Sequence, residues 1–168
     1  MPPFAWLDRQ RASGQETFTQ ADTRGLDLAG ETLNLMPTQQ GIWKPRTLSA
    51  ALAIRTVYRP DGAERPYDDA VGPDGFYRYK MRGTEPDHPD NRGLRTAMQE
   101  RLPLIWWLGV EGGGYSALYP VYLVNEEPVA LQFVVDIDAV PQTDITWPAA
   151  ELEFDPAYRQ HLTKIRLH

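Results

Sequence analysis

Aromatic and acidic side chains gather in one stretch of the chain, in an order that suits the binding of a nucleobase. Tyr58 ends an apolar segment, a Pro- and Gly-containing turn follows, and Tyr67-Asp68-Asp69 comes next. A second aromatic run, Phe76-Tyr77-Arg78-Tyr79-Lys80, follows shortly afterwards. Aromatic rings stack on bases, a carboxylate accepts the hydrogens of an exocyclic amino group, and interleaved cations attract the adjoining phosphate. These residue types together predict a pocket that holds a base by its faces and its amino edge.

Each of these features taken alone has a simpler interpretation. Aromatic residues at alternate strand positions usually pack a core, because strands favour them. A pair of aspartates next to Pro and Gly is typical of a turn. The prediction of a base pocket therefore depends on the combination rather than on any single residue.

Composition and length indicate one folded domain and exclude several classes of protein. The 168 residues, 42% of them hydrophobic and with 5 Trp, are enough to bury a core. The absence of Cys excludes a disulfide framework and a thiolate metal site. No apolar run approaches the roughly 20 residues of a membrane helix, and the first residues do not lead us to expect a signal peptide. We expect no membrane partner, no cofactor, no bound metal and a cytoplasmic, bacterial-type setting.

The charge is unevenly distributed in a way that allows nucleic acid as a partner. The net charge is −6, yet residues 41–101 hold 11 Lys/Arg against 9 Asp/Glu, whereas the remaining residues hold 6 against 14. Because electrostatic attraction is screened over about 8–10 Å in physiological salt, a locally basic face can contact DNA on an acidic protein. Binding through such a face should be modest and strongly salt-dependent.

Hydrophobic periodicity and turn residues predict an α+β chain. Helices are expected at 3–11, 94–101 and 155–168, the last of them beginning at an Asp-Pro N-cap. A small hairpin is expected at 26–35, a projecting loop or short strand at 37–45, strands at 50–58 and 76–80, and an irregular segment at 83–93. Strands at 104–110, 119–125 and 129–136, joined by turns at 112–114 and 125–128, should form an antiparallel meander. Trp106 and Trp107 should lie on opposite faces of their strand.

The order of short motifs resembles the SRA domain, the SET- and RING-associated reader of modified cytosine. The shared motifs, over roughly residues 38–125, are Gly41-Ile42, the strand at 50–58, Tyr67-Asp68-Asp69, Phe76-Tyr77-x-Tyr79, Asn91-Arg92-x-Leu94, Leu104-Ile105 and Tyr119-x-x-Tyr122. The closer likeness is to the N-terminal half of bacterial SRA-HNH modification-dependent restriction endonucleases. In these enzymes Gln-Gly-Ile-x-Lys-Pro, Tyr-Asp-Asp and Pro-Leu-Ile occur in the same order.

The resemblance implies a PUA-like or SRA-like fold, a twisted and partly closed antiparallel β-barrel flanked by short helices. Residues 37–154 would form this barrel, residues 1–36 would pack on it, and residues 155–168 would lead to a fused HNH-like nuclease domain outside this chain. The uncapped end of the last helix fits such a continuation, and equally a frayed terminus. Dimerisation through the nuclease domain stays open.

The resemblance also implies a DNA-binding module that reads 5-methylcytosine, with 5-hydroxymethylcytosine as a further ligand, by flipping the base out of the double helix. Its second stacking aromatic falls on Tyr79 and its base-binding carboxylate on Asp69, with Asp68 as the alternative. Because the chain has an insertion at 59–66, either Tyr58 or Tyr67 matches the first stacking aromatic, and Tyr77 completes the expected pocket.

Two loops are expected to fill the space that a flipped base leaves. One carries Thr38, Gln39 and Gln40, and the other is 83–93 with Asn91 and Arg92. An ordinary exposed role for the two glutamines is equally compatible with the sequence. The cations expected to contact phosphate are Lys44, Arg46, Arg78, Lys80, Arg82, Arg92 and Arg95.

Two other classes of function stay open from the sequence. Asp68 and Asp69 could bind a metal ion for phosphodiester cleavage, as in a metal-dependent nuclease, although no Asp/Glu-x-Lys triplet accompanies them. A PUA-like binder of RNA or of a small ligand is the other alternative, because a fold does not fix its ligand.

Overall fold

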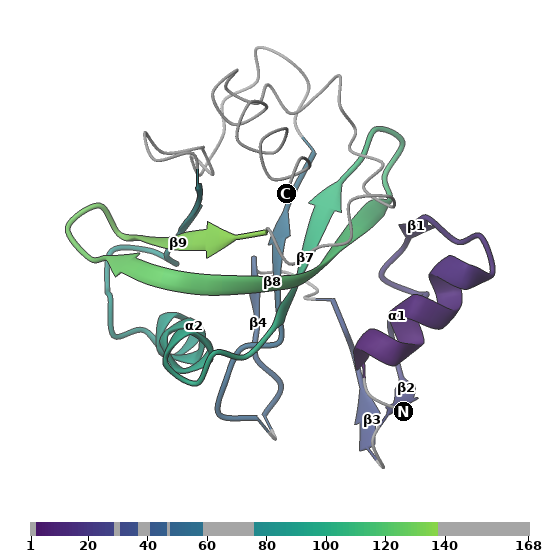
Figure 1. Ribbon diagram of the computed structural model, residues 1–168, viewed down its shortest axis with the longest axis horizontal. Coiled ribbons are helices and arrows are strands. Elements are labelled where there is room, and N and C mark those ends of the chain that lie inside the picture. Colours follow the sequence, from purple (N-terminus) through teal and green to yellow (C-terminus); the bar gives the residue numbers. More distant parts are fainter. Residues whose placement is uncertain (1–2, 29–30, 37–40, 47, 59–75, 138–168) are drawn as a thin grey trace, which may run out of the picture.

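The structure, a computed structural model, describes residues 3–28, 31–36, 41–46, 48–58 and 76–137 (Figure 1). Within these residues a curled, mixed seven-stranded sheet forms half of a barrel, and a two-stranded sheet and two helices accompany it. The elements are α1 (Pro3–Ala12), β1 (Thr17–Phe18), β2 (Leu26–Leu28), β3 (Glu31–Leu33), β4 (Ile42–Trp43), β5 (Ala53–Thr56), β6 (Tyr77–Lys80), α2 (Pro89–Gln99), β7 (Leu104–Gly109), β8 (Tyr115–Glu127) and β9 (Gln132–Asp136). The predicted α+β class is confirmed. The expected helix at 155–168 lies outside the described residues.

Strands β7, β8 and β9 form the predicted antiparallel meander. Gly112 and Gly113 adopt φ values of +93° and +94° in the first turn, which favour glycine over residues with a side chain. The second turn lies later than predicted, because β8 continues through Glu127 and Leu131 N–H donates to Pro128 O across the turn. This 13-residue strand follows the curl of the sheet from one side to the other (Figure 1).

The sheet is not wholly antiparallel, which corrects the expectation of an antiparallel barrel. The strand order is β4-β5-β7-β8-β9-β6, and β5 pairs with β7 in parallel, with Ala53 opposite Ile105. Parallel neighbours require a long crossover connection, and here the chain between β5 and β7 contributes β6 and α2 before it returns. The strand order therefore has β4 at one end and β6 at the other.

Helix α2 begins earlier than predicted and shortens the segment that was expected to be irregular. His88 is its N-cap and Pro89 its first residue, and the His88 Nδ1 accepts a hydrogen bond from Asp90 N–H at 3.1 Å. Proline suits this first position, since its missing N–H has no partner there in any helix. The helix therefore covers residues 89–99 instead of 94–101.

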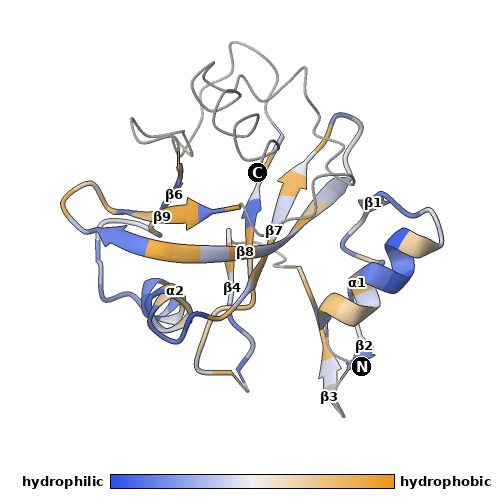
Figure 2. Cartoon of the chain, in the orientation of Figure 1, coloured by the Kyte–Doolittle hydropathy of each residue, from blue (hydrophilic) through white to orange (hydrophobic). Residues whose placement is uncertain are grey.

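Trp106 and Trp107 lie on opposite faces of β7, as predicted, and both are buried. Trp106 belongs to the apolar interior of the curled sheet, and Trp107 to a second apolar cluster on the other face. Helix α1 and the predicted hairpin, now β2 and β3, contribute to this second cluster, to which Leu7 and Trp107 both belong. The apolar start of α1 and the hydrophilic end of β8 are visible in Figure 2. Neither described helix has the length and apolar character needed to span a bilayer.

Candidate nucleic-acid interface

The two inward tyrosines of β6 pack against Trp106. Because side chains alternate along a strand, Tyr77 and Tyr79 share one face while Arg78 lies on the other. The rings of Tyr77 and Tyr79 lie 5.0 and 6.0 Å from the Trp106 ring, centroid to centroid, both in edge-to-face arrangements. Only 4% of Tyr79 is exposed. The fold therefore brings three aromatic side chains together in the apolar interior of the curled sheet. Two of them, Tyr77 and Tyr79, are predicted pocket residues.

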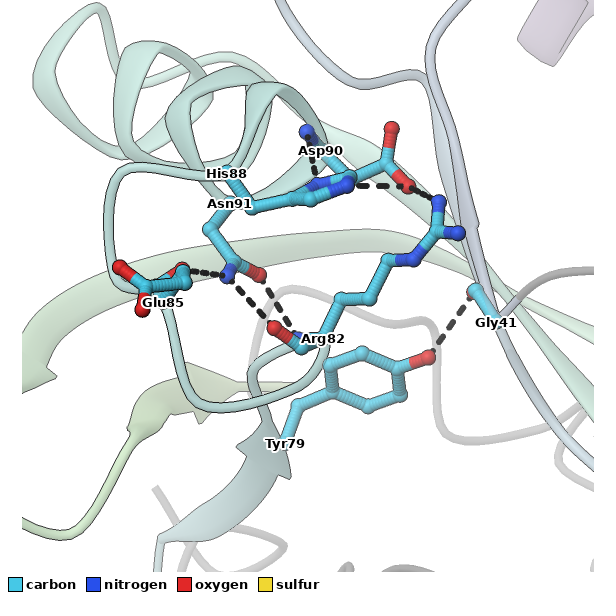
Figure 3. A network of polar contacts seen from close by, with 7 residues as sticks. All are labelled: Gly41, Tyr79, Arg82, Glu85, His88, Asp90 and Asn91. Atoms are coloured by element: carbon cyan, nitrogen blue, oxygen red, sulfur yellow. Dashed lines mark hydrogen bonds and ion pairs between the residues drawn. The ribbon is translucent and has the colours of Figure 1, made fainter.

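The hydroxyl group of Tyr79 reaches the opposite end of the sheet. Its Oη lies 2.9 Å from Gly41 O, just before β4 (Figure 3). It also lies 3.2 Å from Arg55 O in β5. Arg55 N–H donates to the same Gly41 carbonyl at 2.7 Å. Strand β6 is one end of the strand order and β4 is the other. The Tyr79 side chain therefore bridges the gap across which the curled sheet would close.

The chain enters and leaves the segment 59–75 beside Trp106. Before this segment, Thr56 Oγ1 accepts a hydrogen bond of 3.0 Å from the Trp106 indole N–H. After it, the Tyr77 ring contacts the same indole. Tyr58 is half-buried, and its backbone nitrogen would lie only 2.2 Å from a Cβ atom placed on Gly109. The predicted pocket residues Tyr67, Asp68 and Asp69 lie outside the described residues.

The Asn91 side chain is buried and holds the backbone of the preceding turn by hydrogen bonds. Its Oδ1 accepts from Arg82 N–H at 2.8 Å, and its Nδ2 donates to Arg82 O at 3.0 Å and Glu85 O at 2.9 Å (Figure 3). None of the residue is exposed. A side chain that inserts into DNA must be free to leave the protein surface, so the structure does not support the predicted insertion of Asn91. Its neighbour Arg92 is exposed.

Three of the cations expected to contact phosphate are engaged by carboxylates. Arg78, only 6% exposed, donates from Nε to Glu127 Oε1 at 2.7 Å. Arg82 Nη1 lies 2.6 Å from Asp90 Oδ2. The third ion pair, between Arg95 and Glu126, is described next. A phosphate role for any of the three would require its ion pair to open or to be shared.

The pair between Arg95 and Glu126 joins α2 to β8. Arg95 Nη2 lies 2.6 Å from Glu126 Oε1, and its Nε lies 2.9 Å from Oε2, a two-bonded geometry that suits a guanidinium and a carboxylate. The hydrogen bonds from Arg95 lower the pKa of Glu126, and those to Glu126 raise the pKa of Arg95. Both groups are therefore charged in the folded protein at neutral pH.

Two of the remaining expected cations, Lys44 and Lys80, donate to backbone carbonyl groups. Lys44 Nζ donates to Leu48 O at 2.8 Å, and the Lys44 stem packs over Gly93 of α2. Lys80 Nζ lies 3.2 Å from Ala130 O. Arg46 and Arg92 are exposed, and the described part of the chain offers neither of them a carboxylate within ion-pair distance.

Two indoles hold the chain just before the predicted insertion loop, and sequence reasoning did not identify this contact. Trp43 Nε1 donates to Asn34 O, and the buried Trp107 Nε1 donates to Leu35 O, both at 2.7 Å. The sequence around a Trp does not predict which backbone carbonyl will accept the hydrogen bond from its indole N–H. Thr38, Gln39 and Gln40 themselves lie outside the described residues.

Metal ligation has no candidate among the residues described, because no group of three His, Asp or Glu side chains is close enough to share an ion.

Comparison of the chain with family models, with curated proteins and with solved structures found no match in any of the three. The function of the chain is therefore inferred from the geometry given above and from the motif order of the sequence.

Proposed function

We propose that this chain is a reader of 5-methylcytosine in double-stranded DNA, the specificity module of a modification-dependent restriction endonuclease. The observation that carries the proposal is the bond from the Tyr79 hydroxyl to Gly41. It joins the strand that carries the expected stacking aromatics to the residue that directly follows the expected insertion loop. The curled sheet with its short helices fits the SRA-like, PUA-like barrel that we propose as the finer fold assignment. Cleavage belongs to a fused HNH nuclease domain outside this chain.

Recognition by base flipping is energetically feasible with the side chains at hand. Extruding a nucleotide costs a few kcal/mol, and each aromatic stacking contact returns about 1–3 kcal/mol. Tyr79 supplies one ring and either Tyr67 or Tyr58 the other. Because Tyr79 is buried, a base can stack on its ring only if the side chains that cover the ring move aside.

Cytosine is selected by the carboxylate and the methyl group by the space around it. An ionised Asp69, with Asp68 as the alternative, accepts the hydrogens of the cytosine N4 amino group, which thymine lacks. Burying one methyl group contributes about 0.8 kcal/mol, or roughly a fourfold preference at 1.4 kcal/mol per factor of ten. A pocket with that modest preference also admits 5-hydroxymethylcytosine.

Fluorescence anisotropy on matched duplexes tests the proposal. Three duplexes of one sequence carry cytosine, 5-methylcytosine or 5-hydroxymethylcytosine at one central position, with 2-aminopurine beside it to report unstacking. We expect tighter binding of the modified duplexes and a fluorescence increase on binding. Asp69→Ala should remove the preference, whereas Lys80→Ala should weaken binding to all three duplexes equally.

Equal affinity of the natural chain for all three duplexes would refute the proposal. Single-stranded RNA of the same sequence belongs in the same titration, and tighter binding to it would favour the PUA-like alternative. Incubation with Mg²⁺ or Mn²⁺ tests the remaining alternative, because cleavage that Asp68→Ala and Asp69→Ala abolish would indicate a nuclease.

A further inference from the structure

The contact between Tyr79 and Gly41 separates two roles of one side chain. We infer that the Tyr79 hydroxyl is a positioning group, which holds the chain entering β4 at a fixed place relative to β6. The inference rests on the proposed function for its consequence in DNA binding, while the contact itself can be tested without DNA. In this view the ring of Tyr79 serves the base, and the hydroxyl fixes the position of the chain beside it.

The topology gives the hydroxyl this role. Strand β6 pairs with β9, and β4 pairs with β5, at opposite ends of the strand order. The Tyr79 hydroxyl crosses between these ends by lying within hydrogen-bond distance of both Gly41 O and Arg55 O. Since a phenol carries one proton, one carbonyl accepts it at a time, and both carbonyls lie close enough to compete. Phenylalanine would keep the ring and its contact with Trp106 but would lose the bridge.

The Tyr79 hydroxyl leaves no room for a side chain at position 41. A Cβ atom added to Gly41 would lie 2.5 Å from Tyr79 Oη, closer than real side chains allow. Its next neighbours would be Arg55 O at 3.4 Å and Tyr79 Cζ at 3.8 Å, which are tolerable distances. The backbone of Gly41 is outside the left-handed region, so alanine meets no conformational strain there. The need for glycine at position 41 therefore arises from the hydroxyl.

The consequence is a coupling between β6 and the chain that enters β4. On one side of the contact is β6, the strand that carries the proposed stacking tyrosine Tyr79. On the other side, Gly41 follows the expected insertion loop and precedes β4, after which Lys44 packs over Gly93 of α2. If the hydroxyl is lost, the ring can still stack on a base, but the chain entering β4 at Gly41 is no longer held in place relative to that ring. Selective binding should weaken while general attraction to phosphate is kept.

A double-mutant cycle on the full chain tests the contact itself. The variants are Tyr79→Phe, Gly41→Ala and the two combined, with Tyr122→Phe as a matched control, since Tyr122 is a half-buried tyrosine of β8 whose hydroxyl has no hydrogen-bond partner among the described residues. Urea unfolding should show Tyr79→Phe raising the unfolding equilibrium constant roughly 2- to 13-fold, the equivalent of one buried hydrogen bond. Tyr122→Phe should change it less than twofold. Gly41→Ala should be far more damaging alone than in the Tyr79→Phe background.

The cycle remains informative if Gly41→Ala does not fold, because folding of the double variant would then be the expected rescue. Equal effects of Gly41→Ala with and without the hydroxyl would overturn the inference. The DNA arm uses the three duplexes described above. Tyr79→Phe should lose modified-base preference and the 2-aminopurine signal while keeping its affinity for unmodified DNA.

The two proposals fail in different ways. A natural chain without preference for modified DNA refutes the proposed function and the role of the hydroxyl in DNA binding, and a non-additive cycle would still establish the contact. A non-additive cycle with unchanged selectivity in Tyr79→Phe would refute the positioning role alone.

Discussion

Replacing Asn91 with alanine tests whether this residue supports the fold or contacts DNA. Asn91 is fully buried, and its amide makes three hydrogen bonds to the backbone of Arg82 and Glu85. These bonds hold the turn between β6 and α2. Alanine at this position removes the amide and leaves one N–H and two carbonyl groups without that partner.

The expected loss follows from the number of bonds. A buried hydrogen bond contributes about 0.5–1.5 kcal/mol, so three of them amount to roughly 1.5–4.5 kcal/mol. Domains of this size are typically stable by about 5–15 kcal/mol, so Asn91→Ala should fold but be measurably weaker. Asn91→Asp should be at least as destabilising, because it keeps the shape but turns a carboxylate oxygen toward the two carbonyls.

Urea unfolding followed by tryptophan fluorescence is a suitable assay, since Trp106 and Trp107 are buried. Arg92→Ala is the matched control, because Arg92 is the next residue of the same helix and is exposed. Surface substitutions of this kind change the free energy of unfolding by less than about 0.5 kcal/mol. Arg92→Ala should nevertheless weaken DNA binding and reduce its salt dependence by about 0.9 in the logarithmic slope, if Arg92 contacts one phosphate.

A loss below about 1 kcal/mol for Asn91→Ala would refute the reasoning, because it would mean that the three bonds are replaced at almost no cost. A variant of natural stability that had lost DNA binding would go further and restore Asn91 as a DNA-contacting residue. The same stability loss in Arg92→Ala would show that the helix start is sensitive to any substitution.

Two further predictions concern other contacts of the fold. Since Arg95 lowers the pKa of Glu126, unfolded chains take up a proton more readily than folded ones as pH falls below about 4.3, the ordinary value of a glutamate. The free energy of unfolding should therefore decrease in acid, and Glu126→Gln should be less stable at neutral pH with a flatter profile; identical pH profiles would contradict this. Gly109→Ala should be destabilising by at least about 1–3 kcal/mol, because its Cβ would lie 2.2 Å from the backbone nitrogen of Tyr58. Gly114→Ala, whose Cβ would meet nothing closer than 3.6 Å, is the control in the same urea assay, and equal losses would contradict the steric argument.

The sequence was sufficient for the parts of the fold that depend on neighbours along the chain. The meander of β7, β8 and β9 could be predicted because apolar strands and the turn at 112–114 are local signals. The opposite faces of Trp106 and Trp107 followed from the two-residue period of a strand. The start of α2 differs from the prediction because prolines usually interrupt a helix, whereas Pro89 occupies the first helical position, which favours proline.

Pairings between distant segments could not be predicted in the same way. The parallel register of β5 with β7 joins strands about 50 residues apart, such as Ile54 with Trp106, and no local pattern encodes which strand will be the neighbour. The same holds in the candidate site, where the Tyr79 hydroxyl meets a carbonyl 38 residues away. The sequence predicts Tyr79 as a stacking aromatic, but the partner of its hydroxyl depends on how far the sheet curls.

The division of the cations explains why a protein of net charge −6 would have to rely on base contacts to select its DNA. Arg78, Arg82 and Arg95 each lie 2.6–2.7 Å from a carboxylate oxygen. Releasing one of them to a phosphate would leave its carboxylate unpaired next to the negatively charged duplex, which offsets the gain. The exposed Arg46 and Arg92 carry no such cost, but a few exposed cations give only weak, salt-sensitive attraction. Tight and selective binding by the proposed reader would then have to come from the proposed base pocket. The geometry favours this division of labour, because the paired arginines fix α2 and β6 in place while the aromatic side chains meet in the interior of the same curled sheet.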